Sequence, residues 1–303
     1  MSDLFDLNDW RLVYPGVEFG FGTIDTGYPL TTQVDIGTPD ASDNDGKHPN
    51  ADGVVFGIDS RGGRTLTFEV GIPKVYGKGQ RWAPNLDAQE TFAATWDAEP
   101  VRRTAGAVCE LYNDNRDRMV YGRPRNLKPK LDKARQGWSE LTCDFKTSDA
   151  RFYGALEREL VVPAVIAAAR GFSFPLTFPW LPAEQTMQTL VVTNDGTRDT
   201  WPTIEFAGPS TNSTVQLIDQ LGGVAWQVNY TGALAYDETA VVETRPWVRS
   251  VQVNGRPALG QLRGSPLYDC KIPPGTSQVR YLTTDLTGSS TVTLRYRDAY
   301  ASL

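Results

Sequence analysis

Short segments in which apolar and polar residues alternate recur along most of this 303-residue chain. Alternation places every second side chain on one face of an extended segment, so it predicts half-buried β-strands. In the first half of the chain the pattern is clearest at residues 10–14, 31–36, 54–58, 65–70, 107–112, 119–123 and 138–145. We therefore expect a β-rich first module.

Two polar intervals in this half predict β-hairpins. Residues 59–64, with a Gly-Gly pair, separate the alternating segments 54–58 and 65–70. Residues 113–117 separate the next two segments in the same way. Turn residues between alternating segments are the usual sign of a hairpin. By contrast, residues 37–50 have no hydrophobic period, which predicts an exposed loop.

A helical period is clear only at residues 85–96, directly after Pro84. Asn85 is placed to cap the N-terminus of this helix, because a short polar side chain can accept hydrogen bonds from the first turn. The spacing predicts a buried stripe made of Leu86, Phe92, Ala93 and Trp96.

In the second half, strands are expected at residues 189–193, 203–206, 215–218, 225–230, 241–244, 248–253, 279–283 and 292–296. Short strands at this spacing, with turns such as Asn254-Gly255, are typical of an antiparallel β-sandwich. Residues 157–187 contain four prolines that interrupt a continuous helix and predict an extended crossover. The chain thus divides into residues 1–156, 157–187 and 188–303.

Composition and charge narrow the function classes. A net charge of −6 and a pI near 5.0 argue against a sequence-independent DNA binder, which needs a basic face. The acidic N-terminus lacks the regions of a signal peptide, and the most apolar run, residues 160–169, is shorter than the ~20 residues of a membrane helix. We expect a soluble protein made in the cytoplasm, with no membrane insertion and with reduced, buried cysteines.

The loop around Asp43 is the first candidate for chemistry. Aligning Gly46 with the glycine of a calcium-binding EF-hand loop places Asp43 and Asp45 at ligand positions. However, Ala41 stands where the first carboxylate is needed, and Asp52 stands where a bidentate Glu is needed. A solvated loop explains these residues better than a calcium site does.

The chain has a single histidine, His48, which lies in the same polar loop. A buried, oriented general base is not expected there, which argues against Ser-His-Asp and Cys-His catalysis. Gly46-Lys47 lacks the upstream glycine and the Ser/Thr of a phosphate-binding loop. A glycosidase pair of carboxylates stays open, although no pair is singled out. We expect no catalytic residue, no cofactor and no metal.

Two sets of side chains are candidates for binding. Aromatic residues in the second half could stack on a sugar ring, although aromatic residues in strands usually fill a sandwich core; they are Trp201, Trp226, Tyr230, Tyr236 and Trp247. Basic residues in the first half could form ion pairs between subunits or simply be solvated; they are Arg61, Arg64, Arg123, Arg125, Lys128, Lys130 and Arg151.

A succession of segments resembles the distal tail (Dit) family of siphophages, in particular the minor tail proteins of phages that infect actinobacteria. The segments are residues 59–66, 120–125, 145–153, 174–179, 193–204, 206–209 and 272–276. Together they cover nearly the whole chain in order. Ala150 departs from the proline that is usual in the family, which concerns the rigidity of that turn.

This resemblance implies a mainly β protein. Residues 1–156 would form a tail-tube-like β-sandwich or split barrel with one α-helix and would build the ring, and residues 188–303 would form a galectin-like antiparallel β-sandwich. It also implies a structural virion protein at the phage tail tip, assembled in the host cytoplasm. A homo-hexameric ring would join the tail tube protein to the tail hub protein, with the tape measure protein as a further partner.

In that ring DNA would pass through the lumen without specific binding, which suits an acidic chain. The resemblance carries over no catalytic residue, so the chain is not expected to be an enzyme. One alternative is a carbohydrate-binding tail module that contacts the host envelope. Another is a tail-associated glycoside hydrolase.

Overall fold

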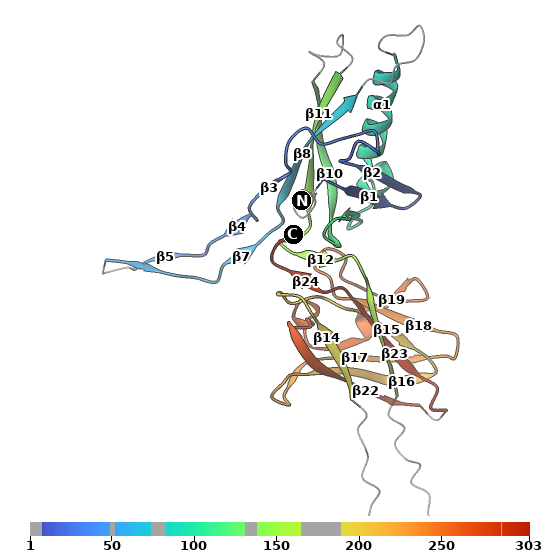
Figure 1. The fold of residues 1–303 in the computed structure, drawn as a ribbon. Helices are drawn as coiled ribbons and strands as arrows, with labels where there is room; N and C mark the ends of the chain where they lie inside the picture. Colours follow the sequence, from blue (N-terminus) through green and yellow to red (C-terminus); the bar gives the residue numbers. More distant parts are fainter. Residues whose placement is uncertain (1–7, 49–51, 74–82, 131–137, 165–188, 286) are drawn as a thin grey trace, which may run out of the picture. The chain divides into compact units, whose positions relative to one another are not determined.

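A computed structural model describes residues 8–48, 52–73, 83–130, 138–164, 189–285 and 287–303. The chain forms two compact units. The first unit contains residues 1–155 and 300–303, and the second contains residues 156–299. Both units are mainly β and are built from antiparallel strand ladders (Figure 1), as the alternating pattern predicted.

The first unit is organised around one large sheet. Its strands are β1 (Trp10–Tyr14), β2 (Val17–Phe21), β3 (Asp35–Ile36), β8 (Thr65–Pro73), β9 (Cys109–Asn113), β10 (Arg118–Lys130), β11 (Trp138–Thr147), β12 (Phe152–Gly154) and β24 (Ala299–Tyr300). The order along its main path is β2-β1-β9-β10-β11-β8-β3. The predicted hairpin across residues 113–117 is confirmed, because β9 and β10 pair with Asn113 opposite Arg118. Of the predicted strand 31–36, only β3 forms.

Helix α1 (Ala83–Asp97), followed by the short α2 (Glu99–Arg102), packs on one face of this sheet. Phe92 and Trp96 lie one turn apart, are buried, and stack with ring centroids 5.6 Å apart. Trp96 also meets Phe21 and Phe68 edge-on, at 5.7 and 6.2 Å. Edge-to-face aromatic pairs at this spacing are favourable beyond the area they bury. This aromatic cluster joins the helix to the sheet.

Two details of the predicted helix are wrong. The helix begins before Asn85, so Asn85 is not its cap; its amide donates to Ile72 O at 2.9 Å and accepts from the Ser139 hydroxyl. Leu86 is 37% exposed and is not part of the buried stripe, and Ala93 is only half-buried. The reason is that the buried face of α1, which includes Asn85 and Phe92, points toward the sheet. Leu86 lies outside this face.

Residues 37–64 leave the sheet as a two-stranded ribbon, which we call the arm (Figure 1). It contains β4 (Ala41–Ser42), β5 (Gly46–Lys47), β6 (Val54–Val55) and β7 (Ser60–Arg61). β4 pairs with β7, and β5 pairs with β6. The predicted hairpin of residues 54–58 with 65–70 is therefore wrong. The first segment pairs with β5, and the second, as β8, pairs with β11.

The second unit is an antiparallel β-sandwich, as predicted. One sheet has the order β13-β23-β15-β18-β19-β20, from β13 (Arg158–Pro163), β15 (Thr203–Ala207), β18 (Thr239–Glu243), β19 (Ser250–Val253), β20 (Arg256–Pro257) and β23 (Thr291–Tyr296). The other has the order β14-β22-β16-β17-β21, from β14 (Leu190–Asn194), β16 (Ser210–Ile218), β17 (Val224–Leu234), β21 (Leu262–Gly264) and β22 (Gly275–Thr284). Two short 3₁₀ helices, Leu259–Gln261 and Leu267–Asp269, flank β21.

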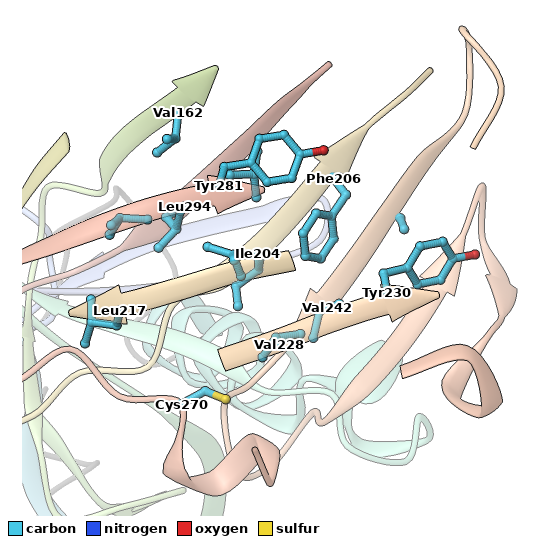
Figure 2. Packing of buried hydrophobic residues seen from close by; sticks show 14 of the residues in the cluster. Val162, Ile204, Phe206, Leu217, Val228, Tyr230, Val242, Cys270, Tyr281 and Leu294 are labelled. Atoms are coloured by element: carbon cyan, nitrogen blue, oxygen red, sulfur yellow. The ribbon is translucent and has the colours of Figure 1, made fainter. Parts of the chain in front are cut away.

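Alternating residues of both sheets meet in one core (Figure 2). Phe206 lies near its centre, with the rings of Tyr230 and Tyr281 at 6.4 and 6.1 Å. All eight strands expected in this half are present, because each carries its own alternation of buried and exposed positions.

The boundaries of the units differ from the expected division at two places. Arg158–Pro163, assigned to the crossover, is strand β13 and pairs with β23 along its whole length. Tyr300–Leu303, assigned to the last domain, belong to the first unit. The remaining crossover residues 165–188 lie outside the described residues. No helix among the described residues has the length and apolar character required to cross a membrane.

Candidate assembly surface

The arm is exposed along its length. Every described residue from Asp40 to Gly62 is exposed to solvent. Among its described residues four ladder pairs hold the strands together, and His48 N also donates to Gly53 O at 3.4 Å. Two side-chain bonds add to them: Gly57 N donates to Asp45 Oδ1, and Asn44 Nδ2 donates to Ile58 O. An isolated two-stranded ribbon is marginally stable in water. The exposed loop that the sequence predicted here is thus an extended ribbon.

The base of the arm is held firmly. Thr147 N donates to Arg64 O, and Arg64 N donates to Thr147 Oγ1, both at 2.8 Å. Asp40 N donates to Gly63 O at 3.0 Å, and Gly62 N donates to Asp40 O at 2.7 Å. A Cβ atom at Gly63 would lie 1.9 Å from Thr147 O, so only glycine fits this crossing. The arm therefore leaves the sheet from a fixed starting point.

Arg64, one of the predicted subunit contacts, is buried at this base. Its guanidinium lies over the Phe152 ring at 4.7 Å and donates to the carbonyl oxygen of Ala150. Burial lowers the pKa of Arg64, and the nearby Asp149 carboxylate opposes that effect. Arg64 therefore contributes contacts within its own chain at the base of the arm.

Asp149 is a buried carboxylate that the sequence did not single out. It is 6% exposed, accepts a 2.6 Å hydrogen bond from the Tyr153 hydroxyl, and lies 3.8 Å from the Arg151 guanidinium. Burial raises the pKa of Asp149 to about 6, although the Tyr153 bond and the charges of Arg151 and Arg64 act in the opposite direction. Its position in a polar turn between two strands gave no sign of burial. Arg151 too thus faces a partner in its own chain.

The remaining predicted basic contacts fall into two groups. Arg123 donates to the carbonyl oxygens of Ala107 and Thr104, both at 2.7 Å, and Lys130 pairs with Glu69 at 3.0 Å. These two side chains are used within the chain. Arg61, Arg125 and Lys128 are exposed and make no ion pair within the part of the chain that the structure describes.

The second half of β10, residues 123–130, lies at an open edge of the sheet. Within the described residues it pairs with β11 on one side, while β9 pairs only with Arg118 to Gly122. Pro124 and Pro129 lack the backbone N–H that a new strand would need. Prolines and charged side chains at an edge disfavour uncontrolled strand pairing. This edge is suited to side-chain contacts more than to strand addition.

The aromatic residues considered for sugar stacking do not form a platform. Trp226 and Tyr230 are each 2% exposed, and Trp201 is 8% exposed. The indole of Trp226 donates to Lys271 O at 2.7 Å. Trp247 is half-buried against Trp201, with ring centroids 6.4 Å apart. Tyr236 is the exposed member of the set, at 78%. Trp226 and Tyr230 lie in the sandwich core because the alternation of β17 (Val224–Leu234) turns them inward.

The described residues offer no evident centre for catalysis. His48 lies exposed on the arm. Cys109, Cys143 and Cys270 are reduced and buried, as predicted, and burial raises the pKa of Cys109 and of Cys270 to about 12. Within the described ranges, no group of three or more His, Cys, Asp or Glu side chains could hold a metal ion.

Comparisons with known proteins point to a fold. The chain matches no protein-family model. No curated protein matches it either.

Two solved structures resemble the chain along nearly its whole length. One is the SPP1 Dit protein, described as a paradigm of the hub adsorption apparatus in phages that infect Gram-positive bacteria. It has a TM-score of 0.57 and 16% identity, covering 94% of this chain and 98% of that chain. The other is a chain of the phage P2 baseplate in its activated conformation with Ca. Its TM-score is 0.53 and its identity 9%, covering 95% of this chain and 97% of that chain. The chain therefore has a Dit-like β fold.

Proposed function

We propose that this chain is a distal tail protein, a structural component of the tail tip of a long-tailed phage. The observation that carries the proposal is the full-length correspondence with the Dit protein, which extends through both units and covers 98% of that chain. A likeness limited to one sandwich would be shared by many unrelated proteins. The same order of segments in the sequence supports the assignment independently.

In this proposal six copies form a ring that joins the tail tube to the tail hub. The first unit builds the ring, and the second unit is a galectin-like sandwich. The exposed arm and the open edge of β10 both belong to the first unit, so this unit has the surfaces that a ring needs. Contacts between two different surfaces of identical subunits close into rings. The tail tube, hub and tape measure proteins are the proposed partners, and assembly takes place in the host cytoplasm.

The face of the first sheet that points away from α1 is the proposed lining of a DNA channel. Its half-buried strand positions carry carboxylates, including Glu69, Glu140 and Asp144, together with Lys146 on the same face of β11, and Glu69 pairs with Lys130. The chain as a whole has a net charge of −6. DNA is held mainly through its phosphates by basic side chains. A lining of mixed charge, without a continuous basic surface, would let DNA pass without specific binding.

The proposed role is structural, without catalysis. The carbohydrate-binding alternative loses its main support because Trp201, Trp226 and Tyr230 are buried in the second unit. For the glycoside hydrolase alternative, the described residues single out no pair of carboxylates, and the buried Asp149 is held by Tyr153 and Arg151 at the base of the arm.

Electron microscopy tests the proposal directly. Negative-stain images of the purified chain should show rings with six-fold symmetry and a central channel. Antibodies against the chain should label the tip of the tail in intact virions. Labelling of the capsid, or the absence of the chain from purified tails, would contradict the proposed function.

A further inference from the structure

The distal part of the arm carries a row of exposed apolar side chains. Val54, Val55, Phe56 and Ile58 are exposed by 55, 54, 83 and 87%. They lie within five consecutive positions of the strand that returns to the sheet. Single apolar residues on a surface are ordinary, but a contiguous group of this kind marks a contact site. The arm therefore displays side chains that are more stable when covered.

The arm is prepared for such a contact. Its base is fixed by the crossing of Gly63 with Thr147, while its distal part has few bonds of its own. A surface that is already extended loses less conformational entropy on binding than a flexible loop does. Covering the apolar row would also stabilise the two-stranded ribbon, which is marginal alone.

The charge of the arm indicates what covers it. Residues 40–61 contain five aspartates against one lysine and one arginine, a net charge of −3 with His48 neutral. The open half of β10 has the opposite character: Arg125 and Lys128 are exposed beside the exposed Pro129, while Leu127 is half-buried and packs against the core of its own unit. One chain thus carries an acidic arm with exposed apolar side chains and an exposed basic strand segment.

We propose that the arm of one copy docks on residues 124–130 of β10 in the next copy, with Phe56 and Ile58 as its anchors. This inference rests on the proposed ring and names the surface by which each copy holds its neighbour. The contact joins two different surfaces, so it propagates around a ring and does not stop at a dimer. Complementary charges fix the orientation, and burial of the apolar anchors supplies most of the affinity.

The first test removes the anchors from the full-length chain. Phe56→Ser combined with Ile58→Ser should raise the concentration needed for half-maximal assembly about tenfold or more, because buried aromatic anchors dominate interface energies. Sedimentation velocity over a dilution series measures this concentration. Ile24→Ser is the matched control, since Ile24 is 80% exposed in the same unit but lies outside the arm. Unchanged assembly of the double variant would overturn the proposal.

The second test identifies the receiving strand. A Phe56→Cys chain is mixed with a Lys128→Cys chain under mild oxidation. The three native cysteines are buried, so they give little background. A cross-linked dimer should form in the mixture, and much less in either variant alone or in a mixture of Phe56→Cys with Ile24→Cys. Cross-linking of Phe56→Cys with itself would indicate contact between two arms and would contradict docking on β10.

The outcomes separate this inference from the proposed function. If the double variant still forms rings and still labels tail tips, the arm contact is wrong and the tail-tip role stands. If the unmodified chain stays monomeric at every concentration and the mixture of Phe56→Cys with Lys128→Cys gives no cross-link, contact between copies is wrong. Tail-tip labelling then decides the proposed function separately.

Discussion

The two units bury the apolar faces of their sheets in different ways. In the second unit two sheets face each other, and residues such as Phe206 and Tyr281 complete a core without help from outside. Its exposed large apolar residues are spread over different elements, for example Val161 on β13, Leu221 in a turn and Leu259 in a 3₁₀ helix. In the first unit α1 packs on one face of a sheet, while among the described residues the arm is exposed and residues 123–130 of β10 pair with a strand on one side only.

This difference indicates where the chain meets other copies. A completed sandwich needs no further partner for stability, whereas an exposed apolar ribbon and an open sheet edge do. The first unit is therefore the better candidate for assembly, and the second unit is the better candidate for a self-sufficient module. The following experiments test that contrast in order of expected size.

Core substitutions should have the largest effect, and each should act on its own unit. Trp96→Ala should lower the unfolding free energy of the first unit by about 3–5 kcal/mol, and Phe206→Ala should do the same in the second unit. Both side chains are buried at ring contacts within their cores. Hydrogen exchange followed peptide by peptide, with urea unfolding, measures each unit. If either substitution destabilised both units equally, the contrast between two separate cores would fail.

The buried carboxyl group at the base of the arm should give the next largest effect. Burial raises the pKa of Asp149 from 3.8 to about 6, so between these values the folded chain binds more protons than the unfolded chain. Its contribution to stability is thus greatest at low pH and is lost as pH rises from about 4 to about 6. The expected loss is about 3 kcal/mol in the unfolding free energy, since one pKa unit corresponds to about 1.4 kcal/mol.

Asp149→Asn removes this titration while keeping a hydrogen-bond acceptor for Tyr153. The difference in unfolding free energy between the original chain and Asp149→Asn should therefore fall as pH rises through this window, measured by urea unfolding at several pH values. Asp25→Asn, in an exposed turn, is the control. A difference that stays constant with pH would show that Asp149 is already ionised when the chain folds.

Charge reversal on the open edge should have the smallest effect on stability. Arg125→Glu combined with Lys128→Glu should change the unfolding free energy by no more than about 0.5 kcal/mol, because both side chains are exposed. The same variant should assemble more weakly, since the acidic arm would meet a like charge. Arg116→Glu, in an exposed turn of the same unit, controls for net charge. Equal assembly of both variants would count against the receiving strand.

Local pattern was sufficient for much of the fold. Strand β1, the β9–β10 hairpin and all eight strands expected in the second half follow from alternation and turn residues that lie close together in the chain. Helix α1 was located from residues within the helix itself, although only Phe92 and Trp96 of the expected stripe are buried. These features depend on neighbours a few positions apart, so a sequence contains the information directly.

Pairing and burial over long distances were decided by the tertiary structure alone. Residues 54–58 and 65–70 alternate equally well, yet β8 found its partner in β11, more than 60 residues further along the chain. The sequence alone predicts that Arg64 lies on the surface. In the structure Arg64 is buried and donates a hydrogen bond to the carbonyl oxygen of Ala150, 86 positions away. Asp149 acquires its raised pKa only because Tyr153, Arg151 and Arg64 enclose it.

The candidate assembly surface also depends partly on local sequence pattern and partly on long-range packing. The sequence by itself determined that residues 37–64 are polar on one strand and apolar on the other, and that residues 123–130 are basic. Only the tertiary structure decided that the first segment is an exposed ribbon anchored at Gly63 and that the second pairs, among the described residues, with a strand on one side only. Exposure is a property of everything that packs around a residue, and a linear pattern cannot specify packing between distant segments.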